Sequence, residues 1–193
     1  MICQMKKRTI ILAVTGLAVA FAAGGFAWRE SSRAAPRANQ TLNKPATSVA
    51  SKTEAARTLF ASAWPDVQGR SVAMQSYSGK PLVVNFWATW CAPCVEEMPA
   101  LDTMAKAMPD AQFVGIGVDT NKNIVDFLAK IPVSYPLLVA GHSAISLVQQ
   151  LGNPAGGLPF TVLVDAKGNV VETILGQVKL DDLSHKIQEL TRN

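Results

Sequence analysis

The feature that most constrains this chain is a pair of cysteines placed where an apolar segment gives way to a segment with helical spacing. The apolar segment is Leu82–Trp87, and three residues later comes the sequence Cys91-Ala92-Pro93-Cys94. This junction predicts a buried strand followed by a helix whose first turn carries both thiols. Unpaired backbone N–H groups and the helix dipole at such a place stabilise a thiolate.

The spacing of the two cysteines predicts different tasks for their sulfur atoms. In the first turn of a helix, Cys91 at the N-cap end faces outward, and Cys94 lies one turn further along the same face. We therefore predict that Cys91 is the nucleophile and that Cys94 resolves the mixed disulfide, so that the two form a redox-active disulfide. Pro93 suits the first turn, because it gives up an N–H that would have no partner there. This chemistry needs no cofactor.

Three other uses of a cysteine pair fit the sequence less well. A zinc site needs more ligands, but the chain has no second cysteine pair, and His142 and His185 lack ligand spacing to the first pair. A structural disulfide across two residues would constrain the unfolded chain little. A peroxiredoxin would carry Thr or Ser three residues before its reactive cysteine and Pro seven before, where this chain has Ala88 and Val84.

The residues around the cysteines resemble the active site of the thioredoxin superfamily. Residues 83–99 have the sequence VVNFWATWCAPCVEEMP, which is similar to that of the TlpA/ResA-type thiol:disulfide oxidoreductases, and the similarity extends from about residue 58 to the C-terminus. It implies a thioredoxin fold of the α/β class, with a central mixed sheet flanked by helices, an N-terminal β extension and a central αβ insertion. Thioredoxin itself carries a buried aspartate where this chain has Asn85, a departure that again resembles the TlpA/ResA branch.

The resemblance also implies roles for residues outside the cysteine pair. Pro159 would be cis and lie beside the sulfurs, and the backbone of Leu158 would pair with an incoming peptide strand. The residues by themselves favour an ordinary trans proline that opens a strand. Glu97 matches the active-site glutamate of the family, which would tune the cysteine pair and could shuttle the proton of Cys94.

Two tryptophans near the cysteines are expected to serve different purposes. Trp87 ends the apolar segment and belongs to the core, whereas Trp90 flanks the thiols and lines the surface on which clients dock. We place Pro93 on the same substrate-binding surface. Glu96, in the first turn of the helix, interacts favourably with the helix dipole without any catalytic duty.

The first 53 residues differ from the rest of the chain. Residues 9–28 are uncharged and follow three basic residues, and as a helix they reach about 30 Å, the thickness of a bilayer core. We predict a cytoplasmic N-terminus (1–8), a transmembrane signal anchor (9–28), a flexible linker (29–53) and a thioredoxin-like domain (54–193). A cleaved signal peptide, which would leave a soluble periplasmic protein, is the alternative, because small residues at positions 18–22 offer cleavage sites.

Charge is distributed unevenly along the chain. Residues 1–53 contain eight basic residues and one acidic residue, a net charge of +7, while residues 54–193 contain ten basic and thirteen acidic residues, a net charge of −3. The folded part is therefore mildly acidic, and nothing in it indicates binding to nucleic acid.

Strand and helix patterns alternate along the C-terminal part, which predicts a mixed sheet covered on both faces. The predicted strands are 72–77, 82–87, 112–118, 137–139, 160–164 and 170–175, with a hairpin turn between the last two. The predicted helices are 95–107, 124–131, 143–151 and 180–190.

These patterns and the resemblance together predict an exported thiol:disulfide oxidoreductase tethered to the bacterial inner membrane, with its catalytic domain in the periplasm. Its partners would be periplasmic protein clients with disulfides or thiols, as in cytochrome c maturation or copper-site assembly, and a membrane electron donor of the DsbD/CcdA type. A general periplasmic oxidant is an alternative, because the direction of thiol-disulfide exchange depends on the reduction potential of the cysteine pair relative to that of its partner. A non-catalytic metallochaperone or binding module is another, although no Met/His cluster accompanies the cysteines.

Overall fold

A five-stranded sheet forms the centre of the computed structural model, which describes residues 46–192. The strand order is β5-β4-β3-β6-β7; β3, β4 and β5 run parallel, and β6 and β7 run antiparallel to their neighbours. The mixed sheet predicted from the sequence is therefore confirmed. Its strands are β3 (Leu82–Trp87), β4 (Gln112–Gly117), β5 (Leu137–Val139), β6 (Phe160–Val164) and β7 (Val170–Leu175).

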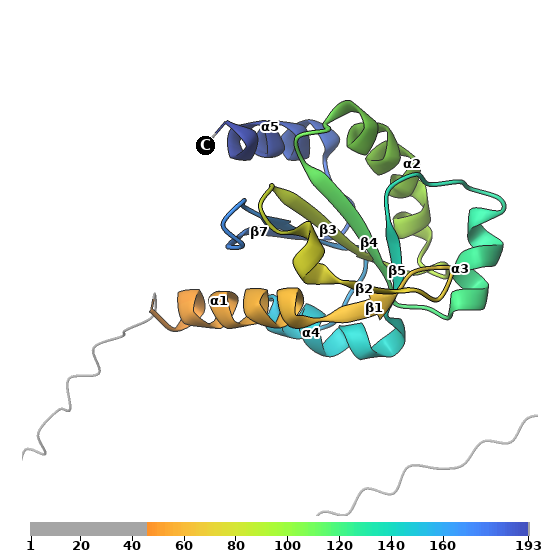
Figure 1. Cartoon of the computed structure of the whole chain (residues 1–193), viewed down its shortest axis with the longest axis horizontal. Helices are drawn as coiled ribbons and strands as arrows, with labels where there is room; N and C mark the ends of the chain where they lie inside the picture. The colour runs from red at the N-terminus through yellow and green to blue at the C-terminus, as the bar shows by residue number, and fades with distance from the viewer. Residues whose placement is uncertain (1–45, 193) are drawn as a thin grey trace, which may run out of the picture. The chain divides into compact units, whose positions relative to one another are not determined.

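Helices cover both faces of the sheet (Figure 1). One core cluster packs α1 (Ala46–Ala61), the short 3-10 helix η1 (Met74–Tyr77) and α4 (Ala144–Gln150) against the sheet. The second cluster contains both cysteines and packs α2 (Ala92–Ala107), α3 (Asn121–Leu128) and α5 (Leu180–Thr191). A second 3-10 helix, η2 (Gly141–Ser143), leads into α4. The sheet thus separates the cysteines from α1 and α4.

Strand β3 lies in the middle of the sheet, and this placement explains its composition. All six of its residues are buried, as expected of a strand that helices cover on both faces. Asn85 is the one polar residue among them, and it stands opposite Gly115 of β4 and Thr161 of β6. A polar side chain is therefore placed at the centre of an apolar strand, where it needs hydrogen-bond partners.

A small hairpin precedes the main sheet and forms the expected N-terminal β extension. It consists of β1 (Ala63–Pro65) and β2 (Ser71–Ala73), and an isolated bridge from Asp66 to Leu138 joins it to edge strand β5. The predicted strand 72–77 is wrong beyond Ala73, because residues 74–77 form η1. The hydroxyl of Ser76 donates a hydrogen bond of 2.7 Å to the carbonyl of Ala73, a local bond that favours a turn over an extended strand.

Helix α1 was not predicted from the sequence. It begins at Ala46, so residues 46–53, which we assigned to the flexible linker, are helical. Its buried residues include Ala55, Ala56 and Leu59, and packing of such a face supplies most of the stability of a helix in a protein. Alanines make this face only weakly apolar in the sequence, which explains why the pattern was missed.

The remaining elements agree with the prediction apart from their ends. Helix α2 begins at Ala92 and α3 at Asn121, each three residues earlier than predicted. Thr120 caps α3, because its side chain accepts a hydrogen bond from the backbone N–H of Asn123. The predicted hairpin turn between β6 and β7 is present, with the backbone N–H groups of Lys167 and Asn169 bonded to the carboxylate of Asp165.

The predicted membrane anchor, residues 9–28, lies outside the described residues, as does most of the predicted linker. Within residues 46–192, none of the helices combines the length and the apolar character that crossing a bilayer requires.

Candidate active site

Cys91 and Cys94 form a disulfide at the N-terminus of α2. The two sulfur atoms are 2.07 Å apart and the two Cα atoms 5.3 Å apart. Cys91 is the N-cap of α2, and its sulfur accepts a hydrogen bond of 3.3 Å from the backbone N–H of Cys94. Pro93 lies in the first turn of the helix, where its missing N–H leaves no partner unsatisfied. The junction between β3 and α2 therefore holds one sulfur next to an N–H group that would stabilise a thiolate.

The two cysteines differ in exposure, but by less than the sequence suggests. Cys91 is 6% exposed and Cys94 is completely buried. Cys91 was expected to face outward, and it is instead largely covered, while Ala92 and Pro93 between the cysteines are exposed. Of the two cysteines, only Cys91 is therefore open to solvent at all.

Glu97 lies one turn after Cys94 on α2 and is 5% exposed. One carboxylate oxygen accepts a hydrogen bond of 2.8 Å from the side-chain amide of Asn85, and the other accepts one of 3.1 Å from the backbone N–H of Val178. Burial raises the pKa of Glu97 above its ordinary value, and these two hydrogen bonds oppose the rise only in part. The site thus contains a buried carboxyl group that holds its proton to a higher pH than an exposed glutamate.

The Leu158–Pro159 peptide bond is cis, as the resemblance implies. Pro159 is buried, and Leu158 is partly buried and packs against both core clusters, including the one that contains the cysteines. The carbonyl of Pro159 accepts a hydrogen bond of 2.9 Å from the backbone N–H of Gly176. The turn before β6 is therefore tied to the segment that follows β7.

Trp90 is 66% exposed, whereas Trp87 is completely buried. The indole of Trp90 lies next to Cys91 in the chain, so a large apolar group is presented to solvent beside the disulfide. Such an exposed aromatic group is suited to contact a partner.

The segment between β7 and α5 contributes to the site, and sequence reasoning missed it. The side-chain amide of Gln177 donates hydrogen bonds of 3.1 Å to the carbonyl of Pro93 and to the carboxylate of Glu96. The next residue is Val178, whose N–H contacts Glu97. These partners are more than 80 residues apart in the chain, and no local pattern connects them, so only the folded sheet brings them together.

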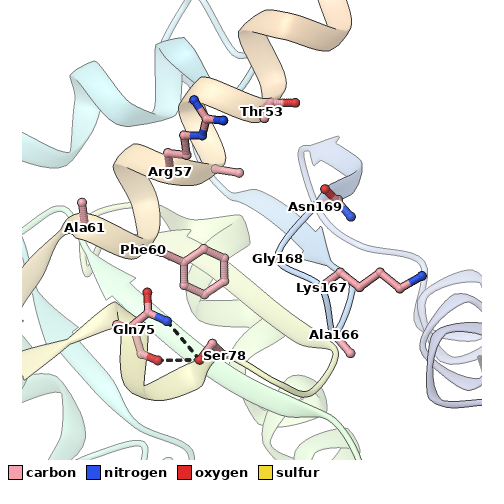
Figure 2. Close-up of a pocket in the computed structure, with 11 residues that line it drawn as sticks. Thr53, Arg57, Phe60, Ala61, Gln75, Ser78, Ala166, Lys167, Gly168 and Asn169 are labelled. Carbon is pink, nitrogen blue, oxygen red and sulfur yellow. Dashed lines mark hydrogen bonds between the residues drawn. The ribbon is translucent and has the colours of Figure 1, made fainter.

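The described residues contain no group of three or more His, Cys, Asp and Glu side chains that could hold a metal ion. They do contain a cavity of about 470 Å³ between α1 and the turn that joins β6 to β7. Figure 2 shows Phe60 pointing into it, with Arg57 and Lys167 at its sides. Because α1 covers the opposite face of the sheet from the cysteine cluster, this cavity is separate from the disulfide.

The sequence pattern of the redoxin family matches residues 36–187. This chain belongs to the redoxin family. Thiol-disulfide oxidoreductase ResA of Bacillus cereus is 26% identical to this redoxin over 129 residues, which cover 65% of this chain and 72% of that protein. ResA of Geobacillus thermodenitrificans is 27% identical over 129 residues, which cover 65% of this chain and 71% of that protein.

Solved structures agree with this family. A thioredoxin-related protein from Neisseria meningitidis serogroup B is 37% identical to this redoxin, with a TM-score of 0.56 over 63% of this chain and 93% of that one. A thiol:disulfide interchange protein of the thioredoxin family from Chlorobium tepidum TLS is 27% identical, with a TM-score of 0.60 over 67% and 92%. The predicted thioredoxin fold is confirmed, and this redoxin is a thiol-disulfide oxidoreductase of the TlpA/ResA type.

Proposed function

We propose that this redoxin reduces the disulfides of specific periplasmic proteins while residues 9–28 tether it to the bacterial inner membrane. The observation that supports the proposal most is the Cys91–Cys94 disulfide at the N-terminus of α2, next to a buried carboxyl group. Residues 29–45 would connect the anchor to the domain, and the domain would face the periplasm. Clients of cytochrome c maturation or copper-site assembly would contain cysteines that must be free thiols before they attach haem or bind copper.

In the proposed reaction, the reduced enzyme begins with two thiols. The thiolate of Cys91 attacks a client disulfide, forms a mixed disulfide and releases the first client sulfur as a thiolate, which takes up a proton. The thiol of Cys94 then loses its proton and attacks the sulfur of Cys91. This second step releases the other client thiolate and leaves the Cys91–Cys94 disulfide. Two electrons pass from the enzyme to the client in the whole cycle.

Glu97 is the proposed acceptor for the proton of Cys94. It lies one helical turn from Cys94, and a carboxyl group with a raised pKa exchanges protons closer to neutral pH than an exposed glutamate. Asn85 occupies the position of the buried aspartate of thioredoxin, but its side chain is an amide and does not take over proton transfer from that aspartate. It donates a hydrogen bond to Glu97 and so orients the Glu97 carboxylate.

The proposed docking surface consists of Trp90, Pro93, Leu158 and Pro159. Two of these residues, Trp90 and Pro93, are exposed, and the backbone of Leu158 would pair with an extended client segment. The oxidised enzyme must be reduced again by a membrane dithiol, for which a donor of the DsbD/CcdA type is the proposed partner.

Trapping of clients tests the roles of the cysteines. Cys94→Ser should accumulate mixed disulfides with client proteins in the cell, because the resolving thiol is missing, whereas Cys91→Ser should accumulate none. Equal trapping by the two variants would contradict the assignment.

The direction of electron transfer and the location of the protein need separate measurements. A reduction potential of the Cys91–Cys94 pair lower than that of its client would support a reductant, and a higher one would support the general oxidant. For the anchor, full-length mass and resistance to alkaline carbonate extraction are expected. A shorter protein in the soluble periplasmic fraction would replace the anchor with a cleaved signal peptide.

A further inference from the structure

A buried carboxylate that the proposed reaction does not use lies two residues after the end of β4. Asp119 is 6% exposed. One of its oxygens accepts hydrogen bonds from the backbone N–H of Thr89, at 3.2 Å, and from the Thr89 hydroxyl. The other accepts from the backbone N–H of Thr120 and from the side-chain amide of Asn123, both at 2.7 Å. Four donors therefore hold this carboxylate in one orientation.

Thr89 is in the middle of the three residues that connect β3 to Cys91. On its N-terminal side, the carbonyl of Trp87 accepts a hydrogen bond of 2.8 Å from the N–H of Val118. On its C-terminal side, the N–H of Cys91 donates one of 3.2 Å to the carbonyl of Ala88. Between these two bonds, Asp119 supplies both partners of Thr89 that the structure records, so the connection is fixed to the end of β4 through Asp119.

The position of this connection decides where the sulfur of Cys91 lies. Cys91 caps α2 through two contacts: its sulfur accepts from the N–H of Cys94, and its carbonyl accepts from the N–H of Val95 at 3.1 Å. A thiolate gains from the first contact only while its sulfur stays in line with that N–H group. Freedom in residues 88–90 would let the sulfur move away from it.

We infer that Asp119 and Thr89 are positioning residues that keep the Cys91 sulfur aligned with the Cys94 N–H group. The inference rests on the proposed role of Cys91 as the nucleophile. Neither residue touches the client or the reacting sulfurs; both act through the backbone that leads to Cys91. The matched pair of Asp119 with Thr89 also explains why a charged group is buried just beyond the buried end of β4, since a buried carboxylate needs several donors.

Burial by itself would raise the pKa of Asp119. The hydrogen bonds from Thr89, Asn123 and Thr120 outweigh it and lower the pKa below its ordinary value. The carboxylate therefore stays ionised over the pH range in which a thiol titrates, and its bonds to Thr89 persist throughout an alkylation experiment.

The test compares Thr89→Val with Thr89→Ser. Both are made in full-length protein with Cys3→Ser and Cys94→Ser, so that Cys91 is the only thiol. Valine has the shape of threonine but no hydroxyl, whereas serine keeps the hydroxyl bond to Asp119. The rate of alkylation by iodoacetamide is measured from pH 5 to pH 10. Glu96 and Glu97 are the same in both variants, so their charges cannot cause a difference between them.

At low pH, the alkylation rate of the Thr89→Val protein should be about threefold to tenfold below that of the parent protein, which carries only the two cysteine substitutions. This factor corresponds to the loss of one hydrogen bond. The rates should converge at high pH, where the thiol is fully ionised, and Thr89→Ser should follow the parent throughout. Two results would overturn the inference: coincident profiles for the valine and serine variants, or a valine profile that falls by the same factor at every pH, which indicates altered access.

A second pair of variants works from the other side of the contact. In Asp119→Asn, the amide oxygen can accept from Thr89 only when the N–H₂ faces the donors of Thr120 and Asn123, and the reverse orientation turns the N–H₂ toward Thr89. One side of the contact is lost in either orientation, and the alignment of Cys91 should suffer as in the valine variant. Adding Asn123→Asp provides an acceptor for that amide and should restore the profile in part. No restoration, with thermal unfolding unchanged between single and double variants, would contradict the inference. Failure of Cys94→Ser to trap clients would instead overturn the proposed role of Cys91 as the nucleophile. The measured dependence of Cys91 alkylation on pH would not be affected by that result.

Discussion

The side-chain amide of Asn85 donates a hydrogen bond of 2.8 Å to the carboxylate of Glu97, and both residues are buried. The amide also donates to the hydroxyl of Thr161 at 3.1 Å. The middle strand of the sheet is thus joined to α2 directly below the cysteines, and the contact orients a carboxyl group whose pKa burial has raised. The direction of that change in pKa makes its effect on stability testable.

Glu97→Gln should flatten the dependence of stability on pH. The pKa of Glu97 in the folded protein is raised above its ordinary value of 4.5, so the folded state holds this proton more tightly than the unfolded state. The stability that the proton contributes is fully present below pH 4.5 and is lost as pH rises through the folded pKa. The loss amounts to about 1.4 kcal/mol for each pH unit that separates the folded and unfolded pKa values. Urea unfolding of the oxidised protein, measured from pH 4 to pH 8, should show this loss in the wild type only.

Glu96→Gln is the matched control for that experiment. Glu96 precedes Glu97 but is exposed and bonded to Gln177, so this substitution should leave the pH slope of the wild type in place. The same slope in all three proteins would show that the carboxyl group of Glu97 is not perturbed.

Asn85→Ala should raise the pKa of Glu97 further, because the Asn85 hydrogen bond is one of the two contacts that lower it. The loss of stability with pH then extends to a higher pH than in the wild type. Carboxyl NMR titration of Glu97 measures this directly. Thr161→Val removes the other partner of the Asn85 amide and keeps the Glu97 contact. An equal rise of the Glu97 pKa in the two variants would contradict the role assigned to Asn85.

Asp102→Asn should destabilise the protein at neutral pH by about 1 to 2 kcal/mol, a figure that allows for screening of the exposed Lys106 by solvent. Burial would raise the pKa of Asp102, but hydrogen bonds from Lys106 and Ser134 outweigh it and lower the pKa from 3.8 to about 2. The stability that this carboxylate contributes is present above pH 3.8 and is lost as pH falls toward 2. The difference between wild type and variant in chemical unfolding should therefore shrink below pH 4.

Asp110→Asn serves as the control for Asp102→Asn, since Asp110 is exposed and lies just after the end of α2, the helix that contains Asp102. Its stability should stay within about 0.5 kcal/mol of the wild type. A deficit in Asp102→Asn that remains constant down to pH 2 would point to lost packing rather than lost charge.

Gln177→Glu should destabilise the protein more than Gln177→Ala. The amide of Gln177 donates to the carbonyl of Pro93 and to the carboxylate of Glu96. Alanine removes two exposed contacts, a loss of about 1 kcal/mol or less, whereas glutamate adds a like charge opposite Glu96. Combining Gln177→Glu with Glu96→Gln should remove the excess, as measured by thermal unfolding at low salt. Equal melting temperatures for the alanine and glutamate variants would contradict this account.

Sequence alone predicted the parts of the site that depend on neighbouring residues. A run of six residues, five of them apolar, is long enough for a strand buried on both faces, and two cysteines with a proline after it fit the first turn of a helix. These are local effects of side-chain spacing and backbone geometry, and β3 and the disulfide at the start of α2 agree with them. The roles assigned to Cys91, Cys94 and Glu97 remain predictions for the experiments above.

Tertiary structure alone decided the partners of the buried groups. Glu97 meets Asn85 and Val178, and Asp119 meets Thr89, across 12 to 81 residues of chain. Their pairing depends on strand order and register, which the sequence of any one segment does not contain. The same reason applies to α1, whose weakly apolar alanine face forms a helix because α4 and the sheet cover it, and to Cys91, whose sulfur is covered by residues from elsewhere in the fold. Local spacing therefore determined most of the strands and helices of the domain, though not α1 or η1. Long-range packing determined which charges and sulfurs would be buried together, because burial depends on neighbours that only the complete fold supplies.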